Sequence, residues 1–95
     1  MLRDRIHELR DEIQALASKH GAVRIRLFGS VARGEDGPEI DVDFLVQLDT
    51  DRSLLDFVNL KLDLEELLGR RVDLVAEGGI SKWIRKRVLR EAQPI

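Results

Sequence analysis

Two aspartates, Asp41 and Asp43, are separated by one residue in a segment whose alternate positions are apolar. In an extended chain such residues point to the same face, with Cα atoms roughly 6–7 Å apart, which suits carboxylates that share metal ions. The turn Gly29-Ser30, separated from Asp41 by ten residues, follows an apolar strand pattern. Its backbone N–H groups and hydroxyl can bind an anion. Together the two motifs predict a site for a metal-bound phosphate.

Neither motif is specific alone. A chain with ten aspartates is expected to contain an Asp-x-Asp pair by chance, and Asp49-Thr50-Asp51 is such a pair, in a polar turn with no phosphate loop before it. Asp41 and Asp43 differ because acids are unfavourable in a strand that is otherwise fit for burial, and such local conflicts mark functional sites. A third acid, Asp73, lies in another apolar strand. Taken alone, Asp73 also fits an edge-strand acid that faces water.

The composition limits the chemistry further. The chain has 95 residues, 43% hydrophobic and 36% charged, which predicts one globular domain spanning residues 1–95. Without cysteine, any metal is expected to be a hard, oxygen-bound ion, and we predict that His7 and His20 are solvated and without a role. No apolar run is long enough to cross a bilayer and no signal peptide is evident, so a cytoplasmic protein without membrane contact is expected.

The elements that position these residues follow from hydrophobic periodicity and from cap signals. The pattern predicts an α/β (α+β) fold with a small mixed sheet of about three strands flanked by helices, in the order α-β-α-β-α-β-α. Helices are predicted at 2–19, 53–68 and 80–92, with a short helical turn ending at Gly34. Strands are predicted at 23–28, with Val23, Ile25 and Leu27 on the buried face, and at 40–48 and 71–76. Residues 77–79 are predicted to form a loop.

Two segments carry more apolar or charged residues than a core requires. Helix 53–68 has apolar positions beyond one stripe, notably Leu55, Val58 and Leu62, and this favours contact with a partner. The last helix is predicted to turn Ile80, Trp83, Ile84, Val88 and Ala92 inward. Its segment 82–90 contains five bases and no acid, which fits either a solvated face or a surface that attracts anions.

The combination of Gly29-Ser30, a ten-residue gap and Asp41-Val42-Asp43 resembles the signature of the nucleotidyltransferase superfamily typified by DNA polymerase β. The form Gly29-Ser30-Val31-Ala32-Arg33-Gly34 and the short chain resemble its minimal nucleotidyltransferase branch, the MntA-like antitoxins. The similarity continues through Leu67 to Val75 and through the closing segment 84–92. The resemblance implies the nucleotidyltransferase fold.

The resemblance also implies roles for individual residues. Gly29 and Ser30 would hold the β- and γ-phosphates of ATP, and Arg33 is a further candidate for the triphosphate, with a structural salt bridge as the alternative. Asp41 and Asp43 would bind two Mg²⁺ ions, and Asp73 would complete the site of the metal that activates the acceptor hydroxyl. Where the branch often has a serine before the first aspartate, this chain has Ile40.

The function implied by the resemblance is Mg²⁺-dependent transfer of AMP from ATP to a tyrosine of a partner HEPN-family (HepT-like) ribonuclease toxin, which silences the toxin. One alternative is a non-catalytic antitoxin that occludes the toxin through helix 53–68. Another is a nucleotidyltransferase that acts on a small molecule or an RNA end. The chain offers no second domain for such an acceptor, and segment 82–90 is short for tRNA, so direct nucleic-acid binding is not expected.

Overall fold

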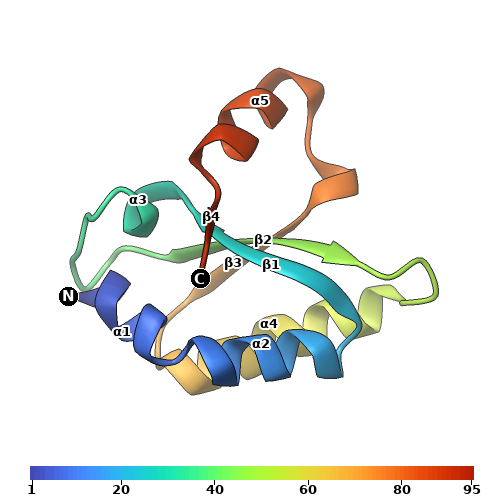
Figure 1. Cartoon of the computed structure of the whole chain (residues 1–95), viewed down its shortest axis with the longest axis horizontal. Coiled ribbons are helices and arrows are strands. Elements are labelled where there is room, and N and C mark those ends of the chain that lie inside the picture. The colour runs from blue at the N-terminus through green and yellow to red at the C-terminus, as the bar shows by residue number, and fades with distance from the viewer.

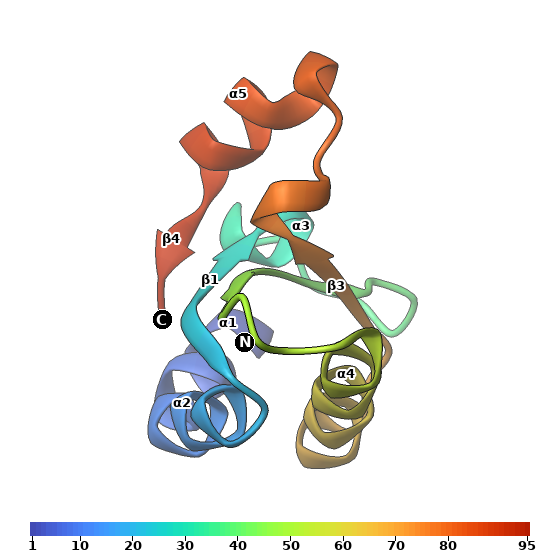
Figure 2. The same ribbon diagram turned by 90° about the vertical axis from the view of Figure 1, so that its right-hand side faces the viewer.

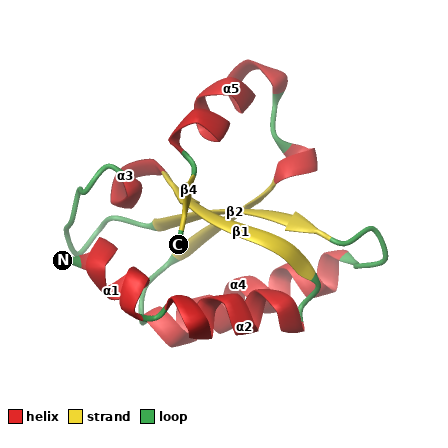
Figure 3. Cartoon of the chain, in the orientation of Figure 1, coloured by secondary structure: helices red, strands yellow, loops and turns green.

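The computed structural model describes residues 1–95 as a mixed sheet with helices on both faces (Figure 1, Figure 3). The strand order is β3-β2-β1-β4, with β1 antiparallel to β2 and β4, and β2 parallel to β3. The strands are β1 (Ala22–Phe28), β2 (Val42–Leu48), β3 (Val72–Ala76) and β4 (Gln93–Pro94). The predicted mixed α/β sheet is confirmed. The fourth strand was not predicted, because two residues ending in proline carry no strand pattern.

Two helical layers cover the sheet. On one face lie α1 (Leu2–Glu8), α2 (Arg10–Lys19) and α4 (Leu54–Leu68), with α2 and α4 side by side (Figure 2). On the other side α5 (Lys82–Glu91) stands away from the strands, joined to β3 through the 3₁₀ turn η1 (Glu77–Gly79), which we expected as a loop. The short helix α3 (Gly29–Ala32) lies in the connection between β1 and β2.

The main core lies between the sheet and the layer formed by α1, α2 and α4. The even-numbered residues Val42, Phe44 and Val46 of β2 are fully buried there, as the period-two pattern predicts. Ile13 of α2 and Leu60 of α4 are also fully buried in this cluster. The odd-numbered face of β2 is therefore the one that α5 approaches.

Only a small apolar cluster attaches α5 to the sheet. Its buried members are Leu45, Ile80 and Val88, with Ala92 partly buried against them. Trp83 is 85% exposed and Ile84 is 52% exposed, so the prediction that both point inward is wrong. The reason is the position of α5, which stands off the sheet and touches it near Val88.

Three further predictions needed correction. The helix predicted at 2–19 is divided at Leu9, whose ψ of 10° interrupts the helical backbone without any glycine or proline. Val23, predicted to be buried, is 64% exposed, because the pairing of β1 with β2 shifts register between Ala22 and Arg24. His20 is not solvated: its side chain is 12% exposed, and Nε2 lies 2.6 Å from Oδ2 of Asp63.

The boundaries of α4 agree with their sequence signals. The backbone N–H of Ser53 donates to the Asp56 carboxylate at 3.1 Å, and Gly69 ends the helix in the left-handed conformation with φ of 65°. None of the helices combines the length and the apolar composition required to cross a bilayer.

Candidate active site

Asp43 and Asp73 are neighbours because β2 and β3 are parallel and pair in register at these two positions. Both residues share the face of Leu45 and Val75, which is the face that α5 approaches. Asp43 is partly buried, whereas Asp73 is exposed because β3 is an edge strand. Asp73 is therefore an exposed acid of an edge strand and, at the same time, the direct neighbour of Asp43 across the two strands.

Gly29 lies directly against the Asp43 carboxylate. In the antiparallel pair of β1 and β2, Phe28 is opposite Asp43, and Gly29 follows with a φ of 75°. A Cβ atom at Gly29 would lie 2.2 Å from Oδ2 of Asp43. Only a glycine therefore permits this backbone conformation and this approach together, and the turn Gly29-Ser30 is brought to the acids as the sequence predicts.

The environment of Asp43 disfavours its charged form. Burial first, and then the neighbouring carboxylates of Asp73 and Asp41, raise the pKa of Asp43 to about 6, while Arg33 opposes this rise. No hydrogen bond contributes to stabilising the carboxylate. A partly buried acid among acids is a typical feature of functional sites, and a bound cation would relieve its repulsion.

Asp41 is held differently. The strand predicted at 40–48 begins at Val42, so Asp41 lies just outside β2, where it is exposed. Its Oδ1 forms a salt bridge with Arg71, 3.0 Å from Nε. No three aspartate, glutamate or histidine side chains are gathered closely enough to hold a metal ion. The structure thus brings Asp43 and Asp73 together and pairs Asp41 with an arginine.

The sequence indicates two alternative roles for Arg33, binding of phosphate and a structural salt bridge. In the structure Arg33 forms salt bridges. Its Nε lies 3.0 Å from Glu35 and its Nη1 lies 3.2 Å from Glu91, while Nη2 donates to Oγ of Ser30 at 3.3 Å. The hydrogen bond with Glu35 is the largest influence that raises the pKa of Arg33. The guanidinium is thus charged and lies at the edge of the Gly29-Ser30 turn.

A cavity of about 250 Å³ brings these residues together with α5. It is lined by Phe28, Gly29, Ser30, Arg33, Asp43, Ile84, Arg87, Val88 and Glu91. The sequence motifs predict no individual role for Arg87 or Glu91. The signal that could have identified them is their spacing of four residues, which puts an acid and a base on one face of a helix.

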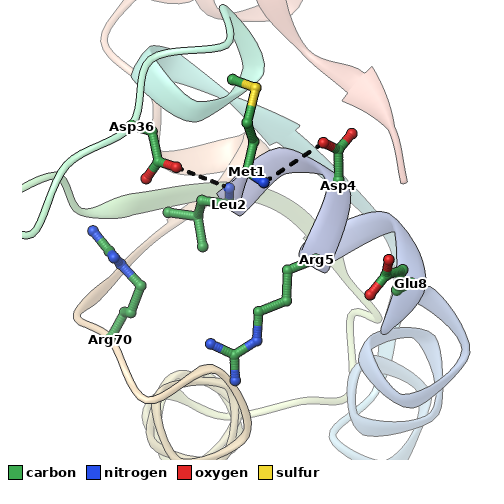
Figure 4. A pocket seen from close by; sticks show the side chains of 7 residues that line it. All are labelled: Met1, Leu2, Asp4, Arg5, Glu8, Asp36 and Arg70. Atoms are coloured by element: carbon green, nitrogen blue, oxygen red, sulfur yellow. Dashed lines mark hydrogen bonds and ion pairs between the residues drawn. The ribbon is translucent and has the colours of Figure 1, made fainter.

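A second cavity, of about 460 Å³, lies beside α1 and contains none of the predicted site residues (Figure 4). Asp36 and Arg70 line one side of it, and Asp36 accepts from the backbone N–H of Leu2 at 3.1 Å. Arg70 also donates to the carbonyls of Gly37 and Ile40, at 2.9 Å for Ile40. Arg70 therefore supports the segment that leads into Asp41.

The fold and the arrangement of Gly29-Ser30 beside paired acids define a class of protein that transfers nucleotides. Residues 6–95 match the nucleotidyltransferase domain family, and the chain belongs to that family. The resemblance to the MntA-like minimal branch is also confirmed. MntA of Thermococcus cleftensis, named a protein adenylyltransferase, is 42% identical over 89 residues, covering 85% of this chain and 90% of its own length.

Other relatives agree. MJ0435 of Methanocaldococcus jannaschii, provisionally named a protein adenylyltransferase, is 41% identical over 87 residues, covering 92% of this chain and 94% of its own length. A solved structure provisionally described as a minimal nucleotidyltransferase is 48% identical, with a TM-score of 0.90, and the match covers 100% of this chain and 97% of that one.

Two more distant structures share the fold. A toxin–antitoxin crystal structure with AMP-PNP is 24% identical, with a TM-score of 0.75, over 87% of this chain and 68% of that chain. A complex of a tri-AMPylated HEPN toxin of Shewanella oneidensis with its MNT antitoxin is 22% identical, with a TM-score of 0.66, over 87% and 65% of the two chains. At these identities the likeness concerns the fold alone.

Proposed function

We propose that this nucleotidyltransferase transfers AMP from ATP to a tyrosine hydroxyl of a partner HEPN-family ribonuclease toxin and so silences it. The observation that carries the proposal is the contact of the Gly29 backbone with the carboxylate of Asp43, next to Asp73. It puts an anion-binding turn and two acids at one end of the sheet. The names of the relatives, which are protein adenylyltransferases, and of the distant toxin complexes support the choice of substrate and partner.

In this proposal each element contributes one part of the site. Gly29 and Ser30 hold the β- and γ-phosphates, with Arg33 beside them. The acceptor hydroxyl gives up its proton, its oxygen bonds to the α-phosphorus, and the bond from that phosphorus to pyrophosphate breaks. Asp41, Asp43 and Asp73 supply the negative charge that holds the cations required for this displacement.

The acids fit Mg²⁺ by donor type, because carboxylate oxygens are the ligands that this ion prefers. Burial and the neighbouring acids raise the pKa of Asp43, an effect that a bound cation would oppose, and Asp41 would exchange Arg71 for the metal. When bound, two Mg²⁺ ions lower the pKa of the acceptor hydroxyl and neutralise charge on the leaving pyrophosphate. Asp41 and Asp43 would hold these ions, and Asp73 would complete the site at the acceptor side.

Intact mass of a co-expressed HEPN partner tests the proposal. We expect an AMP-sized increment on the partner's tyrosine with the wild-type chain and none with the double variant Asp41→Asn, Asp43→Asn. The matched control is Asp49→Asn, Asp51→Asn, which removes the same charges from an exposed Asp-x-Asp pair beyond the opposite end of β2. An unmodified partner that is nevertheless neutralised by the wild-type chain would contradict the proposal.

Thermal melting tests the metal and nucleotide separately from transfer. Mg²⁺ with ATP is expected to raise Tm more than either alone, because each ligand neutralises charge that repels the other. Asp43→Asn should abolish this combined shift while leaving a cooperative melt. A wild-type melt that does not respond to Mg²⁺ and ATP argues against the site.

One observation favours occlusion as a second candidate function. On α4, Leu54 is 76% exposed, Leu55 66% and Leu62 54%, an apolar surface that no other element of the chain covers. If this surface alone neutralises the toxin, the variant Asp41→Asn, Asp43→Asn still protects cells from it. Loss of protection in that variant excludes occlusion as the mechanism.

A further inference from the structure

The carboxylate of Glu91 lies between two arginines. Its Oε2 is 3.2 Å from Nη1 of Arg33, and its Oε1 is 3.4 Å from Nε of Arg87. Arg33 follows the Gly29-Ser30 turn, whereas Arg87 and Glu91 lie one turn apart on α5. The two oxygens of the Glu91 carboxylate therefore contact one arginine beside the Gly29-Ser30 turn and one arginine of α5.

All three charged groups border the cavity that contains Gly29, Ser30 and Asp43. Arg87 is the only base of segment 82–90 that lines this cavity. Arg85 instead donates to the carbonyl of Glu77 at 3.3 Å, and Lys82 lies 5.4 Å from the centre of the Trp83 ring. The basic segment is thus not a uniform charged face, because one of its bases faces the site.

We propose that Arg87 is a further phosphate-binding side chain, and that Glu91 is an internal counter-ion which the phosphates of a nucleotide displace from Arg33 and Arg87. The inference rests on the proposed function, since it assigns the occupant of the same cavity. It extends that site from the β1–α3 turn to α5. Glu91 and Asp43, the two acids that line the cavity, then act in opposite ways. When the nucleotide binds, Glu91 separates from the two arginines, whereas Asp43 remains beside the cation.

The contacts of Glu91 are of a kind that a phosphate can replace. Arg87 is 73% exposed and its pair with Glu91 is a single contact between residues four apart, which is weak when exposed to water. A phosphate offers a guanidinium two parallel, charge-assisted hydrogen bonds. Arg33 loses the Glu91 contact but keeps Glu35 at 3.0 Å, so its position beside Ser30 is maintained during the exchange.

Calorimetric titration of the full chain with ATP and with inorganic tripolyphosphate, without partner or metal, tests this inference. Arg87→Gln should weaken both ligands roughly tenfold, the loss of about one charge-assisted contact. Glu91→Gln should tighten both by several-fold, because it frees two arginines and removes a repelling charge. The matched control is Arg90→Gln, an exposed base of the same helix that does not line the cavity.

The outcomes separate this inference from the proposed function. If the wild-type chain binds ATP and Arg87→Gln binds it as tightly as Arg90→Gln does, the inference fails and the proposed function stands. If Glu91→Gln weakens binding, Glu91 is a brace for Arg33 rather than a displaceable counter-ion, and the inference is overturned. If the wild-type chain binds neither ligand, the inference fails, and the proposed function is decided separately by the mass and melting experiments, which contain Mg²⁺. At high salt, which screens charge, the difference in tripolyphosphate affinity between Arg87→Gln and the wild-type chain should disappear.

Discussion

At the scale of single residues, the site depends on a carboxyl group that folding makes less acidic. Burial and the acids Asp73 and Asp41 raise the pKa of Asp43 to about 6. The folded protein therefore holds this proton at pH values where the unfolded chain has released it. As the pH rises from about 4 to above 6, the ionisation of Asp43 lowers the free energy of unfolding.

Asp43→Asn should accordingly stabilise the protein while abolishing transfer. Above pH 6 and in the presence of a chelator, we expect a gain in the free energy of unfolding of about 1–2 kcal/mol, allowing for solvent screening of a partly exposed group. At pH 4 most of this gain should be lost, because the carboxyl is then protonated in the folded state and about half protonated in the unfolded chain. Urea unfolding at pH 4 and 8 measures this, and a gain that does not depend on pH would contradict an origin in the ionisation of Asp43. Asp49→Asn is the control.

Gly29 is the second residue on which the site depends. Gly29→Ala should cost about 2–3 kcal/mol, because the added Cβ strains a positive φ and collides with the Asp43 carboxylate. Gly34→Ala separates the two effects: Gly34 also has a positive φ, of 87°, but no atom lies within 4 Å of the position that its Cβ would occupy. It should cost about 1 kcal/mol. Equal costs in urea unfolding would show that the contact with Asp43 does not matter.

At the scale of elements, the segment that leads into β2 is fixed by hydrogen bonds from a side chain in the loop after α4. Arg70, just after α4, donates to the carbonyls of Gly37 and Ile40, immediately before Asp41. Arg70→Met should free residues 37–41 and cost about 1–2 kcal/mol of stability, because two carbonyls lose a charged donor. Hydrogen exchange measures this as lost protection at Val42, whose N–H donates to the Arg71 carbonyl. Arg10→Met on the exposed side of α2 is the control, and unchanged protection would contradict the role of Arg70.

The elements also show what the sequence can and cannot predict. The alternation in β2 and the caps of α4 are local signals, and Val42, Phe44 and Gly69 follow them. The exposure of Trp83 follows from the position of α5 relative to the sheet, and the interruption at Leu9 lies within an unbroken apolar repeat, so periodicity predicts neither. The same holds in the site. The motifs predict that Gly29 and Asp43 meet, whereas the pairing of Glu91 with Arg33 requires the tertiary position of α5.

At the scale of the whole molecule, the two faces of the sheet differ in content. One face is covered by α1, α2 and α4 and contains the large apolar core, while the acids lie on the face toward α5. Beyond the core, the outer surface of α4 presents Leu54, Leu55 and Leu62. The face that carries chemistry and the surface suited to a protein partner thus belong to different elements.

The double variant Leu55→Ser, Leu62→Ser should weaken capture of the HEPN partner while changing stability by less than about 1 kcal/mol, because both side chains are largely exposed. Co-purification reports partner binding, and thermal melting reports stability. The contrasting variant is Leu60→Ala on the buried side of the same helix, which should cost about 2–5 kcal/mol. Undiminished capture by the double variant would remove α4 from the partner interface.

The most direct test of the central claim is the fate of the phosphates of ATP. The chain is incubated with its HEPN partner, Mg²⁺ and ATP labelled at either the α- or the γ-phosphate. Transfer of AMP predicts that the α-label appears on the partner and that the γ-label is released with pyrophosphate. Incorporation of the γ-label, or of neither label by a chain that binds ATP, would contradict it.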